Sequence, residues 1–253
     1  MKTLLFLLLF SSNVYSKNIT IVFFEDAEPV SFSTPMDEHA IGILPSIAEE
    51  ALEEITIRDP NTKIELLGFP WIRAQDMVRN GEADAMMTVA TQERLTYTTP
   101  SNLPVFNDAF RAFTYAGHPR MEELKKISSL DDLKKFTVCE YRVNGWAKAN
   151  LVGKAKEINY TKNIDAKVSM LVLRRCDLIV ELDFLVFSIG KRFNFYDKIV
   201  ELPALFKGTS YHLLVSKKST HQELLPIFDK KLKNMNEQGR IKKIIQRWVP
   251  EIK

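Results

Sequence analysis

The 253-residue sequence predicts an α/β fold built as two consecutive blocks. Short β-branched or aromatic runs alternate with segments of helical spacing, which is the pattern of α/β proteins. The turn residues at 117–119 interrupt this alternation, which then starts again. A hydrophobic content of 45% is ample for a core. We predict one block over 17–112 and another over 113–215, followed by C-terminal helices that must pack back on one of them.

The first sixteen residues are typical of an export signal. Met1 and Lys2 give a basic start, and 3–10 is an apolar run too short to span a bilayer as a helix. Val14 and Ser16 suit the −3 and −1 positions of cleavage after Ser16. The alternative is a buried N-terminal strand. No later stretch approaches 18 apolar residues, so we expect a soluble mature protein.

The first block is predicted to hold four strands and two helices. The strands are expected over 19–24, 63–67, 83–89 and 110–115, and the helices over 43–55 and 71–80. A loop is expected over 25–29, between the first strand and the first helix. Ser46 and Glu49 have the spacing of a capping box, and Gly81 is a common type of C-cap.

The second block is predicted to repeat this alternation. Helices are expected over 129–135 and 168–174, and strands over 136–139, 177–180 and 211–216. Thr220 and Glu223 have capping-box spacing before a helix that Gly239 ends, and a final helix runs to Trp248.

Charge and motifs exclude several classes of function. The formal net charge is +3, which is too small for nucleic-acid binding by bulk electrostatics. The sequence contains no phosphate-binding glycine loop and no nucleophile elbow. Its histidines lack metal-ligand spacing, so we expect neither metal nor cofactor: His39, His118, His212 and His221. Basic residues over 230–247 form either a solvated face or a docking surface for a membrane partner.

The two cysteines, Cys139 and Cys176, leave their pairing open. Export to an oxidising compartment would permit a disulfide, but two cysteines make no framework and their spacing does not show that they meet.

The most informative segment runs from Trp71 to Pro100. Thr88 and Arg94 fall at the carboxyl end of a predicted buried strand, where open α/β sheets bind ligands. Arginine presents a rigid fork of donors that fits a carboxylate, and an aromatic ring such as Trp71 can supply an apolar wall. The segment therefore predicts a carboxylate-binding site.

The order of a helix, a GE-ADA strand, a T-x-E-R turn and a T-T-P turn resembles the family 3 bacterial extracellular solute-binding proteins. These are the periplasmic receptors of polar amino-acid ABC importers. Three further segments match the family in the same order, namely 129–133, 175–179 and 236–248. The resemblance covers nearly all of residues 17–250.

The resemblance implies a two-lobed periplasmic-binding-protein type II fold, each lobe a mainly parallel sheet flanked by helices. Two crossing strands, near 110–115 and 211–216, would join lobe 1 (17–112 plus 216–253) to lobe 2 (113–215). It also implies a periplasmic monomer that closes on a small amino-acid-like carboxylate, delivers it to an ABC-transporter permease and does no chemistry on it.

Roles for first-lobe residues also follow from the resemblance. Arg94 matches the family arginine that grips the ligand α-carboxylate, and Thr88 matches a hydroxyl residue that bonds the ligand. Thr91 lies in the same turn. Trp71 falls where the family places an aromatic against the ligand side chain, with core packing as the alternative. Phe24 is expected to be either a cleft wall or core.

The second lobe departs from the family pattern. The usual Gly-Thr turn is replaced by 141–145, where Arg142 would present a second guanidinium or remain a solvated loop residue. The position of the ammonium-binding acid is Leu182, flanked by Glu181 and Asp183, either of which would serve.

Two rival functions share the predicted fold. An exported, dehydratase-like enzyme would need a general acid or base in the cleft, for which the candidates are Glu28, Glu181 and Asp183. A free-standing ligand sensor is the other rival.

Overall fold

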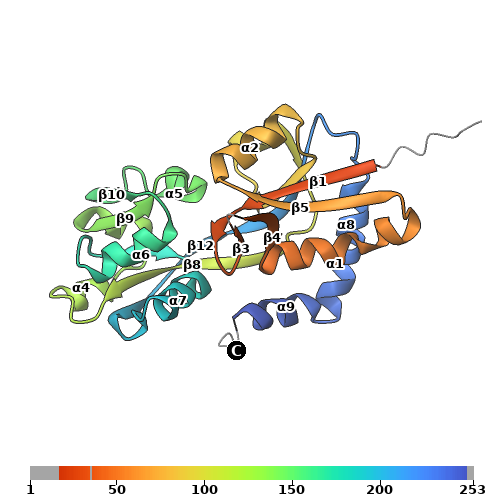
Figure 1. Ribbon diagram of the computed structural model, residues 1–253. Helices are drawn as coiled ribbons and strands as arrows, with labels where there is room; N and C mark the ends of the chain where they lie inside the picture. Colours follow the sequence, from red (N-terminus) through yellow and green to blue (C-terminus); the bar gives the residue numbers. More distant parts are fainter. Residues whose placement is uncertain (1–16, 35, 250–253) are drawn as a thin grey trace, which may run out of the picture.

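The computed structural model describes residues 17–34 and 36–249 and shows two lobes joined by two long strands (Figure 1). The predicted export signal lies outside the described residues. The joining strands are β8 (Phe106–Tyr115) and β12 (Ile199–Ser216), which pair antiparallel. They contain both predicted crossing segments. Among the described residues, no helix has the length and apolar composition needed to cross a membrane.

The first lobe is organised around three strands. β1 (Lys17–Phe24) lies between β5 (Thr62–Phe69) and β6 (Ala85–Val89) and is parallel to both. On its other side, β6 pairs antiparallel with the end of β12. Over residues 17–34 and 36–249, this lobe also contains four short strands: β2 (Asp26–Ala27), β3 (Ser31–Thr34), β4 (Asp37–Ile41) and β7 (Thr98–Pro100). Since parallel strands end at the same edge, β1 and β6 deliver their last residues to one place.

In the described part of the chain, five helices flank this lobe. They are α1 (Ile43–Arg58), α2 (Trp71–Asn80), α3 (Gln92–Leu95), α8 (Leu224–Glu237) and α9 (Arg240–Trp248). The C-terminal helices return to lobe 1 and lie against α1 (Figure 1). Arg240 donates to both carboxylate oxygens of Glu50, at 2.9 and 2.6 Å. α8 and α9 therefore pack on the helix α1.

Two predicted capping boxes are not formed. α1 begins after Gly42, so Ser46 lies inside the helix, where its hydroxyl accepts from the Trp248 indole N–H. α8 begins after Glu223, which leaves Thr220 outside the cap position. Gly42 has φ 125°, and a Cβ there would lie 2.8 Å from the Pro29 carbonyl oxygen, so only glycine fits this position.

The second lobe carries three strands, β9 (Thr137–Tyr141), β10 (Glu157–Thr161) and β11 (Ile179–Glu181). β9 pairs in parallel with β10, and β11 pairs antiparallel with β8. The α-helices are α4 (Met121–Leu124), α5 (Gly145–Asn150), α6 (Ile164–Val172) and α7 (Asp183–Arg192). The 3₁₀ helices are η1 (Leu130–Lys135) and η2 (Tyr196–Lys198).

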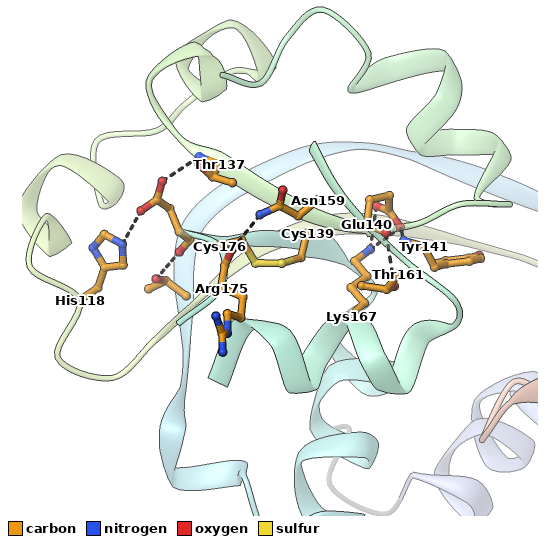
Figure 2. Close-up of a disulfide and its surroundings, with 12 residues drawn as sticks. His118, Thr137, Cys139, Glu140, Tyr141, Asn159, Thr161, Lys167, Arg175 and Cys176 are labelled. Atoms are coloured by element: carbon orange, nitrogen blue, oxygen red, sulfur yellow. Dashed lines mark hydrogen bonds and ion pairs between the residues drawn. A yellow bond between two sulfur atoms is a disulfide. The ribbon is translucent and has the colours of Figure 1, made fainter. Parts of the chain in front are cut away.

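A disulfide joins Cys139 of β9 to Cys176, which precedes β11 (Figure 2). Backbone hydrogen bonds reinforce the junction, since Cys139 N donates to Leu178 O and Asp177 N donates to Thr137 O. The pairing that the sequence left open is therefore made. It ties together the two strands that carry Glu140 and Glu181.

Candidate functional site

A cavity of about 70 Å³ lies between the lobes and is lined by both. Lobe 1 contributes the ends of β1 and β6 and the start of α2, while lobe 2 contributes the loop after β9, the end of β11 and part of α7. The lining is mainly apolar, and its aromatic residues are Phe24, Trp71, Phe110, Tyr141, Trp146 and Tyr211. Among the described lining residues, two have charged side chains, Arg94 and Glu181.

Arg94 is held at the first-lobe wall by neutral groups. Its side chain is almost fully buried, with the residue 5% exposed. Nε donates to Gln75 Oε1 at 3.1 Å, and Nη1 donates to Val89 O at 2.9 Å and Thr88 Oγ1 at 3.3 Å. The guanidinium carbon lies 5.0 Å from the centre of the Trp71 ring, in cation–π range. Burial lowers the pKa of Arg94, and the nearby tyrosines and Glu93 offset this only in part.

Nη2 is the unused end of this guanidinium, since it makes no hydrogen bond to any described residue. It points toward Gly145 of lobe 2, where a Cβ would lie 3.4 Å from Nη2 and 3.3 Å from Thr91 Cγ2. Thr91 is the N-cap of α3, and its hydroxyl accepts from Arg94 N at 3.3 Å. Thr91 therefore orients the arginine and faces an outer groove rather than the cavity.

Lobe 2 places a buried triad behind its wall, formed by Lys167 of α6, Glu140 of β9 and Glu181 of β11. Figure 2 shows Lys167 reaching from α6 to Glu140. The three residues are 0%, 1% and 3% exposed. The Lys167 ammonium donates to both Glu140 oxygens at 2.9 and 2.8 Å, to Glu181 Oε2 at 3.0 Å and to Val180 O at 2.9 Å. All three ammonium protons are used within the protein.

The carboxylates of Glu140 and Glu181 differ in how many hydrogen bonds they accept. Glu140 accepts from Lys167, from Tyr141 N and from the Asn144 side-chain amide. Glu181 accepts from Lys167 and from Leu182 N. A carboxylate has about four lone-pair sites, so Glu181 retains acceptor capacity, and it is the acid that lines the cavity.

Burial and the neighbouring charges shift the pKa values of Glu140 and Lys167. Burial raises the pKa of Glu140, which Lys167 only partly offsets. Burial would lower the pKa of Lys167, but Glu140 and Glu181 outweigh it, so the Lys167 pKa is raised. Burial also raises the pKa of the Tyr141 phenol well above its usual value, so Tyr141, which lines the cavity, carries a neutral hydroxyl.

Three predicted site residues do not line the cavity. The Arg142 guanidinium lies over the Tyr160 ring, 5.3 Å from its centre, because the loop after β9 directs it to the outer surface. Asp183 begins α7 and pairs with Arg111 of β8, which turns it away from the cavity. Thr91 caps α3, as described above. Phe24, Trp71, Thr88, Arg94 and Glu181 do line the cavity.

Polar contacts also join the lobes at the rim. The Asn163 side-chain amide of lobe 2 donates to Asp26 of lobe 1 at 3.0 Å. Arg192 of α7 pairs with Glu28 and, within its own lobe, with Asp165. Glu28, considered above as a catalytic acid, thus forms a rim ion pair and does not line the cavity.

Sequence reasoning missed the triad partners Lys167 and Glu140 and the Arg94 partner Gln75. One signal was present for Lys167, which falls in the apolar stripe of α6 formed by Ile164, Val168 and Leu171. A lysine inside a buried helical stripe implies a buried anion nearby, because such a charge is costly unless it is paired.

The chain matches the family model "Bacterial extracellular solute-binding proteins, family 3" over residues 19–251. No curated protein matches the sequence. Among solved structures, the substrate-binding protein of an amino acid ABC transporter has a TM-score of 0.69 at 17% identity, covering 92% of this chain and 100% of that one.

A histidine kinase sensor domain with similarity to periplasmic binding proteins has a TM-score of 0.73 at 18% identity, covering 91% of this chain and 95% of that one. An ancestral arginine-binding protein bound to arginine has a TM-score of 0.71 at 19% identity, covering 91% and 97%. These likenesses confirm the predicted two-lobed α/β fold. Since the family model spans nearly the whole described chain, this protein belongs to the family 3 bacterial extracellular solute-binding proteins.

Proposed function

We propose that the protein captures a zwitterionic, amino-acid-like ligand between its lobes and delivers it to an ABC-transporter permease, without chemistry on the ligand. The observation that carries this proposal is the charge pattern of the cavity. Buried Arg94, whose Nη2 is unused, and Glu181 line the same cavity from opposite lobes. A ligand carboxylate at Arg94 and a ligand ammonium at Glu181 would satisfy both.

The energetics favour a ligand with both charges. Arg94 carries one positive charge with neutral partners, and the triad of Lys167, Glu140 and Glu181 carries one net negative charge. Buried charges without partners are costly, and each cost is relieved when the opposite charge of a zwitterion arrives. Glu181 is preferred to Asp183 for the ammonium because Asp183 is paired with Arg111 outside the cavity.

Closure of the two lobes would complete the site. We place the hinge where β8 and β12 pass between lobe 1 (17–112 with 216–253) and lobe 2 (113–215), near the pairing irregularity that follows Phe206. The rim contacts Asn163–Asp26 and Arg192–Glu28 would then form only in the closed state. Cleavage after Ser16 would deliver the protein, as a monomer, to the periplasm.

Replacing Arg94 with glutamine is expected to weaken ligand binding by at least about 100-fold, because the charged bonds to the ligand carboxylate are lost in a buried site. The measurement is isothermal titration calorimetry with an amino-acid panel. Arg73→Gln is the matched control, since Arg73 is exposed, lies over Phe69 and does not line the cavity. Equal affinities for the wild type and a folded Arg94→Gln protein would exclude the proposed pose.

Replacing Gly145 with alanine is expected to weaken binding by about tenfold, or about 1.4 kcal/mol. The new methyl group would lie 3.3 Å from Thr91 Cγ2 and 3.4 Å from Arg94 Nη2, so it would oppose the approach of lobe 2. Melting temperature of the ligand-free protein should be unchanged. Lys148→Ala is the control for a change in the same helix, because Lys148 is exposed and does not line the cavity. Unchanged affinity in Gly145→Ala would contradict this contact.

A ligand sensor is the second candidate, favoured by the likeness to a histidine kinase sensor domain over 91% of this chain. Deletion of the gene distinguishes the two roles. Loss of uptake of the radiolabelled ligand is expected for an importer receptor. Normal uptake, with loss of the transcriptional response to the ligand, would instead support the sensor.

A further inference from the structure

The size of the cavity limits the ligand that it can hold. Its volume is about 70 Å³. An apolar protein cavity of about 150 Å³ holds one benzene molecule, so the space here is roughly half of that. Such a space admits a backbone-sized zwitterion with little or no side chain. A long side chain would need the walls to move.

The cavity is small because aromatic rings fill the space around it. Trp146 of lobe 2 stacks on Phe110 of β8, with ring centres 4.2 Å apart and planes within 15°. Phe24 packs against Trp71 at 6.1 Å, and Tyr211 stacks on Phe106 at 4.8 Å. Rings that pack on one another at these distances leave no room for a ligand group between them.

The charged side chains that line the cavity also limit which ligands it can bind. Arg94 and Glu181 are the charged groups among the described lining residues, and the proposed pose uses both. The ammonium of Lys167 has no proton left to donate. An ionised ligand side chain would therefore be buried without an opposite charge, which is strongly unfavourable.

We infer that the ligand is a small neutral amino acid of the size of glycine or alanine, and that Trp146 and Phe110 set this size limit. The inference rests on the proposed function and adds the ligand class to it. It also separates this protein from the arginine-bound relative of similar fold.

The test is calorimetry on protein that has been unfolded, dialysed and refolded to remove any bound ligand. The titrants are glycine, L-alanine, L-leucine, L-arginine, L-glutamate and propionate. Glycine or L-alanine is expected to bind at least about 100-fold more tightly than L-arginine or L-glutamate. Tighter or equal binding of L-arginine, L-glutamate or L-leucine would overturn the size and charge limits while leaving the proposed function intact.

Propionate tests the proposed function separately, because it has the size and carboxylate of alanine but no ammonium. Weak binding of propionate is expected. Propionate binding as tight as that of L-alanine, or no binding by any amino acid, would overturn the zwitterionic pose itself and the inference with it.

Trp146→Leu tests the size limit directly, since it opens space beside Phe110 while keeping an apolar wall. The ratio of L-leucine to L-alanine affinity is expected to rise by at least about tenfold. Phe110→Leu is the second variant, in case loss of the buried indole prevents folding, and it should shift the ratio in the same direction. An unchanged ratio in a folded variant would show that the ring pair does not set ligand size.

Discussion

Replacing Lys167 with methionine is expected to lower the free energy of unfolding by about 3–5 kcal/mol. The change removes the ammonium and leaves Glu140 and Glu181, both almost fully buried, without a positive partner. Breaking a buried ion pair from one side is among the most costly single substitutions. At about 2–4 °C per kcal/mol for a chain of this size, the melting temperature should fall by roughly 6–20 °C.

The loss in the free energy of unfolding of Lys167→Met is expected to grow as the pH rises. Burial raises the pKa of Glu140 even in the presence of Lys167, and removing the lysine raises it further. A carboxyl group whose pKa is higher in the folded chain contributes stability below its unfolded pKa and loses it as pH rises through the folded pKa. Lys167→Met should therefore be more stable near about pH 5 than near about pH 8.

Lys162→Met is the matched control, because Lys162 is an exposed lysine just before the same helix. It should unfold within about 0.5 kcal/mol of the wild type. Adding Glu140→Gln to Lys167→Met should recover part of the loss, since it removes one uncompensated charge. A Lys167→Met protein with wild-type stability at both pH values would show that the triad is not a buried ion network.

Part of the fold was predictable because its signals are local. The helix over 71–80 was predicted with the bounds that α2 has, since Gly81 ends it in a left-handed conformation with φ 82°. By contrast, β12 was predicted only over 211–216, although it begins at Ile199. Pro203 and the exposed, apolar Leu205 conceal the alternation, and the pairing with β8 is irregular between Glu201 and Leu205.

The helix α7 was missed for a related reason. Phe184, Leu185 and Val186 are consecutive and all buried, so the helical period is hidden within an apolar run. Such a run fits a buried strand as well as a buried helix. Periodicity distinguishes the two only where one face is solvated.

In the candidate site, too, some residues could be predicted from the sequence and others could not. Arg94 and Thr88 were chosen as site candidates because the end of a parallel strand is a position that sequence can locate. The pairing of Lys167 with Glu140 and Glu181 depends on how α6 packs against β9 and β11, which no local pattern encodes. The direction of Arg142 was likewise set by the loop and the Tyr160 ring.

Replacing both cysteines with alanine is expected to lower the free energy of unfolding by about 4 kcal/mol. Cys139 and Cys176 are 37 residues apart, and the bridge restricts the unfolded chain by closing this loop. The measurement is urea denaturation of Cys139→Ala/Cys176→Ala beside oxidised and reduced wild-type protein. The reduced wild type lacks the bridge but keeps both cysteine side chains, so it separates the effect of the bridge from the effect of altered packing. The reduced wild type and the double variant should have similar midpoints.

Ligand affinity of the folded double variant is expected to stay within about threefold of the wild type, because other bonds hold the same strands in register. Cys139 N donates to Leu178 O at 3.1 Å, and the Asp177 carboxylate accepts from Thr137 N at 2.7 Å. These hydrogen bonds are expected to keep Glu140 and Glu181 in place around Lys167 without the bridge. A large loss of affinity with unchanged stability would reverse these assignments, making the disulfide a determinant of the site and not of folding.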